Sequence, residues 1–60
     1  MKEYELKLAT GQTVIWEGRD GGTAAAQNYA DSHPGSAVVA WRDYPRHGFF
    51  PSVSARQIIG

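Results

Sequence analysis

The sequence predicts an α+β domain with the element order β-β-α-β-β, in which a four-stranded antiparallel sheet (spatial order 2-1-3-4) has one helix packed on one face. Three observations predict this fold: two strand-like stretches near the N-terminus, an alanine-rich stretch between glycine and proline, and a short apolar run at 37–41. At 60 residues the chain is expected to form a single domain, 1–60. Because it has no cysteine, neither a disulfide nor a thiolate metal site supports the small core.

Residues 3–8 are the clearest half-buried strand in the sequence. Apolar side chains alternate there with charged ones, as expected when one face of a strand is buried and the other is solvated. These apolar residues are Tyr4, Leu6 and Leu8. Residues 13–17 are β-branched and aromatic and predict a second strand after Thr10-Gly11.

The loop between these two strands decides their register. With a three-residue loop that ends at a left-handed Gly11, Leu6 faces Val14 and Tyr4 faces Trp16, so the apolar side chains share one side. A two-residue loop would place Val14 and Trp16 among the charged side chains. The hydrophobic pattern therefore selects the three-residue loop.

The middle of the chain predicts one helix. The glycine-rich residues 18–22 end the second strand, Thr23 is expected to cap the helix, and residues 24–32 have high helix propensity. A narrow stripe of mostly small side chains lies at helical spacing. Its members are Ala26, Tyr29, Ala30 and His33. Pro34-Gly35 ends the helix.

The run at 37–41 predicts an interior strand that ends before Arg42-Asp43, and residues 53–59 are the last strand candidate. A helical crossover makes the second and third strands parallel, and the first strand runs opposite to both. The third strand therefore pairs with the first, which gives the order 2-1-3-4.

The segment around 44–50 is the best candidate for a binding surface. It combines aromatic and cationic side chains, which are enriched at protein interfaces and also stack on nucleic-acid bases. These residues are Tyr44, Arg46, His47, Phe49 and Phe50. The competing interpretation is structural, since Phe49 or Phe50 can fold back to complete a small core.

The sheet face away from the helix is a second candidate. Three apolar residues, Ile15, Val38 and Ala40, are expected there, with Ile58 as a possible fourth. Charged residues of both signs are expected to surround them: Glu5, Lys7, Glu17, Arg42 and Arg56. Such a patch suits sheet-to-sheet packing in a symmetric dimer, and an ordinary solvated sheet face is the alternative.

No catalytic, cofactor or metal site is expected. The glycine-rich segment 18–23 lacks the lysine of a phosphate-binding loop, and Asp20 would repel an anion. Asp31-Ser32-His33 are neighbours in sequence and cannot adopt the geometry of a hydrolytic triad. Asp43 and His47 show no recognised ligand spacing. We therefore expect neither an enzyme nor a small-molecule substrate.

Charge and composition bound the remaining functions. The formal net charge is zero, with −2 on residues 1–31 and +2 on residues 32–60, so no overall field attracts nucleic acid or anionic membrane. The sequence predicts a cytoplasmic interaction module that binds protein or itself. The alternative is a nucleic-acid accessory protein that uses Arg42, Arg46, Arg56 and the loop aromatics. High Ala, Gly and Arg usage fits a GC-rich bacterial or phage source.

Overall fold

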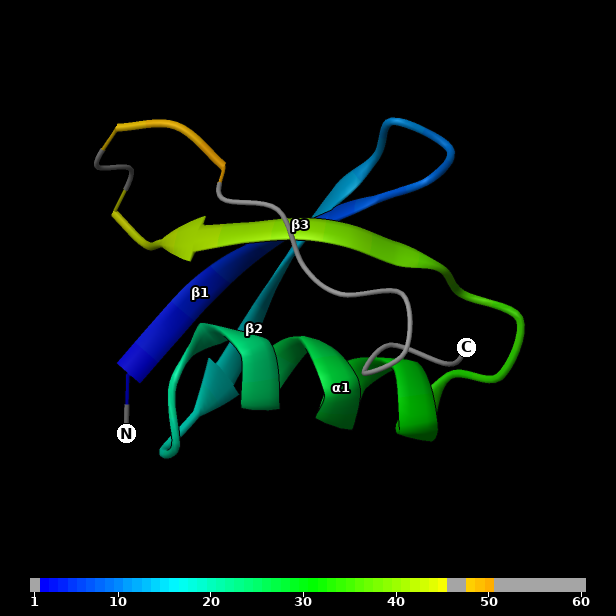
Figure 1. Ribbon diagram of the computed structural model, residues 1–60, viewed down its shortest axis with the longest axis horizontal. Coiled ribbons are helices and arrows are strands. Elements are labelled where there is room, and N and C mark those ends of the chain that lie inside the picture. Colours follow the sequence, from blue (N-terminus) through cyan, green and yellow to red (C-terminus); the bar gives the residue numbers. More distant parts are fainter. Residues whose placement is uncertain (1, 46–47, 51–60) are drawn as a thin grey trace.

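The computed structural model describes residues 2–45 and 48–50 and shows an α+β fold (Figure 1). Strands β1 (Lys2–Leu8), β2 (Thr13–Gly18) and β3 (Val38–Asp43) form an antiparallel sheet in the order β2-β1-β3. Helix α1 (Gly22–Ser32) packs on one face. The predicted fold class and the strand order 2-1-3 are confirmed, whereas the predicted fourth strand at 53–59 lies outside the described residues.

The β1–β2 hairpin has the register that the hydrophobic pattern predicts. Leu6 pairs with Val14 and Tyr4 pairs with Trp16. The Leu8 amide donates a hydrogen bond of 2.8 Å to the carbonyl of Gln12, which closes the three-residue loop. Gly11 has a φ of 93°, a conformation that favours glycine. Loop chemistry and burial therefore agree on one register.

The core lies between β1 and α1. Leu6 on the central strand is fully buried, and Ala25, Ala26 and Ala30 of α1 pack in the same cluster. Alanine side chains let the helix approach the sheet closely, so a short helix can bury this face. Gly22 extends the stripe of small residues to the first turn of α1.

The start of α1 differs from the prediction, because Thr23 does not cap the helix. Gly21 holds the N-cap position and no side chain caps the first turn. The hydroxyl of Thr23 instead accepts a hydrogen bond of 3.1 Å from Nε1 of Trp41. A half-buried indole N–H needs an acceptor, and this use of the hydroxyl explains why the cap prediction is wrong.

Strand β3 begins and ends later than predicted, and its register is irregular. Leu8 pairs with Val38 but Lys7 pairs with Ala40, so Val39 is an extra residue between them. A bulge of this kind reverses the alternation of side chains on either side of it. Val38 is therefore buried in the core on the helix side. The prediction that Val38 faces away from the helix is wrong for this reason.

The C-terminal end of α1 is fixed by three ring contacts. Tyr29 and His33 are stacked, with ring centroids 4.2 Å apart, and Trp16 of β2 meets both rings edge-on. The backbone amide of His33 also donates to the Tyr29 carbonyl at 2.9 Å. His33 therefore completes the helix end and joins it to β2.

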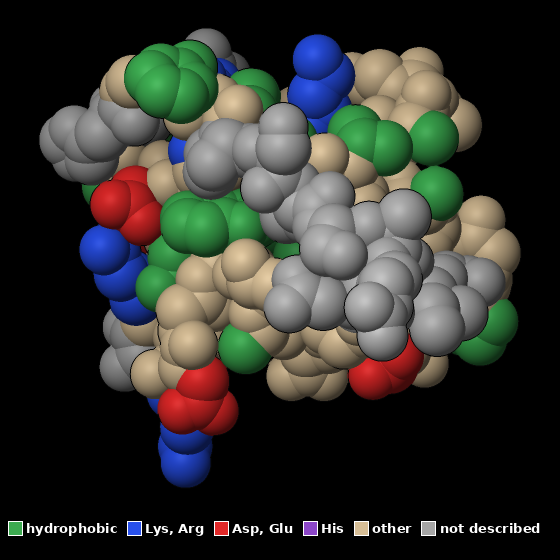
Figure 2. All heavy atoms as spheres, viewed as in Figure 1, with side chains coloured by type: hydrophobic (Ala, Val, Ile, Leu, Met, Phe, Trp, Pro, Cys, Tyr) green, Lys and Arg blue, Asp and Glu red, His purple; other side chains and the backbone are tan. Residues whose placement is uncertain are grey.

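The side of the described residues seen in Figure 2 has no large patch that is purely apolar or of a single charge sign. There, hydrophobic side chains form separate small groups, and acidic and basic side chains are interspersed among polar atoms. Such a surface gives no single-sign field on this side of the described residues.

Candidate functional site

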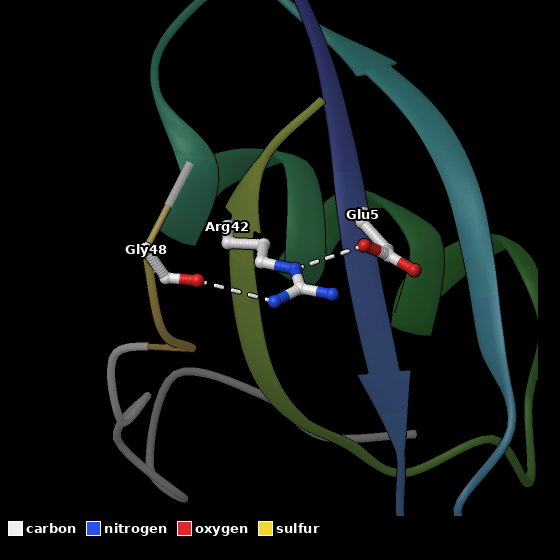
Figure 3. A network of polar contacts seen from close by, with 3 residues as sticks. All are labelled: Glu5, Arg42 and Gly48. Carbon is white, nitrogen blue, oxygen red and sulfur yellow. Dashed lines mark hydrogen bonds and ion pairs between the residues drawn. The ribbon is translucent and has the colours of Figure 1, made fainter. Parts of the chain in front are cut away.

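The sheet face away from α1, here called the outer face, has a buried ion pair near its middle. Nε of Arg42 on β3 donates to Oε1 of Glu5 on β1 at 2.9 Å (Figure 3). The Glu5 side chain is 3% exposed and that of Arg42 is 17% exposed. Glu5 was expected at the solvated rim of an apolar patch. The structure corrects this, because the outer face has a charged pair where that patch was predicted.

Residues 48–50 cover this ion pair. Nη1 of Arg42 donates to the carbonyl of Gly48 at 3.2 Å, so the guanidinium connects β1 to this segment (Figure 3). The ring of Phe50 lies over the guanidinium, with 4.1 Å between Cζ and the ring centroid. Nζ of Lys7 lies 5.8 Å from the same ring. These contacts fix residues 48–50 against the outer face, on the side of β3 opposite α1 (Figure 1).

The two phenylalanines of this segment have different environments. Phe50 is half-buried on Arg42, whereas Phe49 is 84% exposed. Neither belongs to the core cluster between β1 and α1. Tyr44 at the end of β3 is 41% exposed, and its amide donates to the Glu3 carbonyl at 3.1 Å. Tyr44 and Phe49 therefore present aromatic surface from an anchored backbone.

The remaining predicted site residues do not form one patch. Ile15 is on the outer face of β2 and is 43% exposed, but β1 separates it from β3. Val38 belongs to the core. Arg46, His47 and Arg56 lie outside the described residues.

A second feature lies along β2 and was not predicted. It is a hollow of about 390 Å³ lined by Glu3, Ile15, Trp16, Glu17 and Asn28. The lining includes side chains from both faces of β2, so the hollow follows the edge of β2 that does not pair with β1. Glu3 and Glu17 are direct cross-strand partners. The predicted register implies this pair of carboxylates, so the signal was present in the sequence.

In the part of the chain that the structure describes, no group of three or more His, Asp or Glu residues is placed to hold a metal ion. The same residues include no helix with the length and apolar character needed to cross a membrane. The glycine-rich segment before α1 has no lysine, as the sequence indicates.

Comparison with known proteins found no matching family model, no matching curated protein and no matching solved structure.

Proposed function

We propose that the chain is a small protein-binding module whose contact surface is the segment 44–50. The main support is the contrast between two adjacent residues. Phe50 packs on Arg42, and this contact holds the backbone in place, while Phe49 exposes 84% of its surface. Aromatic side chains are enriched at protein interfaces, and Phe49 offers such a side chain to a partner.

Anchoring of the segment adds to this support. Gly48 is hydrogen-bonded to Arg42, and Tyr44 to the backbone of β1. Residues whose backbone is already held in place, such as Tyr44 and Gly48, lose less conformational entropy on association. Tyr44 and Phe49 are therefore proposed as the two contact side chains.

The nucleic-acid alternative has less support. It relies on Arg42, Arg46, Arg56 and the loop aromatics. Of these arginines, the structure describes only Arg42, and its guanidinium is hydrogen-bonded to Glu5 and to the carbonyl of Gly48. Binding to phosphate would require breaking a mostly buried ion pair, which is unfavourable.

Self-association by sheet-to-sheet packing also has less support than the segment 44–50. It relies on an apolar outer face, whereas Val38 is in the core and Glu5 and Arg42 lie on that face. A fourth strand at 53–59, paired with β3, remains part of the proposed fold. We further propose a cytoplasmic module without catalytic activity.

Site-specific photo-crosslinking tests the proposed surface. A photoreactive phenylalanine analogue replaces Phe49, and in a matched control it replaces Val39, another exposed apolar residue at 44% exposure. We expect a protein adduct at position 49, in cells of the source organism or with a second copy of the chain, and none at position 39. The adduct should persist at high salt, because an apolar contact is weakly screened.

Three results would contradict this proposal: equal crosslinking at both positions, no adduct at position 49, or an adduct with nucleic acid. Sedimentation with a short DNA at low salt and at high salt provides a second measurement. Salt-sensitive binding of that DNA would favour the alternative function.

A further inference from the structure

The outer edge of β2 has the backbone geometry of a strand-addition site. In the described part of the chain, β2 pairs with β1 on one side and with no strand on the other. In an antiparallel ladder, hydrogen-bonded residue pairs alternate with non-hydrogen-bonded pairs. The hydrogen bond from the Leu8 amide to the Gln12 carbonyl makes Leu8 and Gln12 a hydrogen-bonded pair, so the next pair, Lys7 with Thr13, is non-hydrogen-bonded. The backbone groups of Thr13, Ile15 and Glu17 therefore point away from β1, toward the free edge.

This edge lacks the features that usually prevent strand addition. The six residues of β2 include no proline and no lysine, and their pairing with β1 has no bulge. By contrast, the register of β3 is irregular. The β2 edge is a regular row of donors and acceptors available to another strand.

The acidic side chains beside the edge of β2 indicate which side chains an added strand would have. Glu3 and Glu17 face each other in a non-hydrogen-bonded pair, in which side chains are closest. Like charges at such a position destabilise a sheet. Among the described residues, neither carboxylate is in a salt bridge, since Lys2 pairs with Asp43 and Arg42 pairs with Glu5.

The hollow along β2 supplies apolar contacts next to these carboxylates. Ile15 lies on its outer-face side, Trp16 on its helix side, and Asn28 of α1 adds an exposed amide. Its volume of about 390 Å³ falls within the range of ordinary binding sites. An extended segment with cationic side chains on one face and apolar side chains on the other matches this hollow. Its cationic face meets the carboxylates on the outer-face side, and its apolar face meets Trp16 on the helix side.

We propose that β2 binds an extended basic peptide segment of a partner protein by antiparallel or parallel strand addition. Cationic side chains of that segment lie beside Glu3 and Glu17, and its apolar side chains contact Trp16. This site does not involve the segment 44–50. Failure of either proposal therefore leaves the other intact.

The test uses the full chain and a synthetic peptide of alternating lysine and valine with blocked ends. Backbone NMR shifts and amide exchange report where the peptide binds. We expect shifts confined to residues 13–18 and their neighbours, with new protection of the Ile15 and Glu17 amides. Replacing both carboxylates, Glu3→Gln with Glu17→Gln, should weaken binding about 3- to 10-fold.

Matched controls separate strand addition from charge attraction. The double variant Asp20→Asn with Asp31→Asn removes the same charge from exposed sites elsewhere and should leave binding unchanged. A peptide with alternate backbone nitrogens methylated keeps its charge but loses its edge donors, and it should not bind. A peptide with glutamate in place of lysine should not bind either.

Equal binding of the methylated or the glutamate peptide would overturn the proposal. Shifts located mainly outside β2 would overturn it too. If the free chain dimerises through the same amides and excludes the peptide, the edge is occupied by a second copy and the proposed partner is wrong.

Discussion

The ring of Trp41 packs directly against the backbone of Gly22, at a place where any Cβ would overlap the indole. Gly22 is the first residue of α1, so this contact sets how closely the helix approaches β3. Gly22→Ala should therefore destabilise the protein by about 1–3 kcal/mol, although alanine is the better helix former. Denaturant unfolding gives this free energy.

A double-mutant cycle identifies the cause of that loss. In a Trp41→Phe background the ring is smaller, and Gly22→Ala should have a smaller effect on the free energy of unfolding. An equal loss in both backgrounds would show that the overlap is not responsible.

The hydroxyl of Thr23 gives a second prediction. It accepts the indole N–H of Trp41, and valine has nearly the same shape without an acceptor. Thr23→Val should lower the free energy of unfolding by about 0.5–1.5 kcal/mol, because the indole loses its partner. Thr23→Ser keeps an acceptor and should recover part of this loss. If Thr23→Val unfolds like the wild type while Thr23→Ser is destabilised, the methyl packing of Thr23 and not the hydrogen bond contributes to stability.

The burial of the Glu5–Arg42 pair predicts that two similar substitutions lower the free energy of unfolding by very different amounts. Glu5→Gln leaves the mostly buried guanidinium of Arg42 without its countercharge and should cost about 3–5 kcal/mol. Asp43→Asn breaks the exposed pair with Lys2 and should cost at most about 1 kcal/mol. Chemical denaturation of the two variants checks this ranking, and comparable losses would contradict it.

The same pair should also control the segment 48–50. In Glu5→Gln the guanidinium lacks the carboxylate that orients it, so its contacts with Gly48 and Phe50 should weaken. Amide exchange in residues 48–50 should then increase more than exchange in β2. Unchanged exchange there would show that the segment is held by other contacts.

The N-terminal half of the fold was predictable because several local signals agree. Alternating burial in β1, the loop ending at Gly11 and the pairing of Tyr4 with Trp16 all select one register. Helical spacing also placed Tyr29 and His33 on one side of α1, since they lie four residues apart, and their rings are stacked there. Local propensity and tertiary packing coincide in these elements.

The errors arise where a tertiary contact overrides a local rule. No sequence signal marks the bulge at Val39, and that one extra residue moves Val38 from the outer face to the core. Thr23 resembles a helix cap, yet the distant Trp41 uses its hydroxyl. Arg42 resembles a residue that follows a strand, but pairing with Glu5 keeps it within β3. The sequence placed Phe49 and Phe50 together in the candidate binding segment, and the structure shows that Phe49 is exposed. The contact of Phe50 with Arg42 could not be predicted, because it depends on the position of Arg42 on the outer face.

The neighbouring phenylalanines predict a separation of stability from binding. Phe50→Ala removes the ring over Arg42 and should cost about 1–2 kcal/mol, from lost burial and the cation–π contact. Phe49→Ala changes a side chain that is 84% exposed and should alter stability by at most about 0.5 kcal/mol. Thermal unfolding measures both, and a larger loss in Phe49→Ala would contradict the assigned roles.

The pairing of Glu3 with Glu17 predicts that the protein can be stabilised at the expense of its proposed edge site. Glu17→Lys converts a repulsive cross-strand pair into an attractive one and should raise the free energy of unfolding by about 0.5–1 kcal/mol. Asp20→Lys makes the same charge change in the exposed turn before α1 and should have little effect. The lysine–valine peptide should bind Glu17→Lys more weakly than the wild type, because a cation now occupies the place of its own lysine. A variant that is more stable yet binds this peptide equally well would show that the carboxylate pair plays no part in recognition.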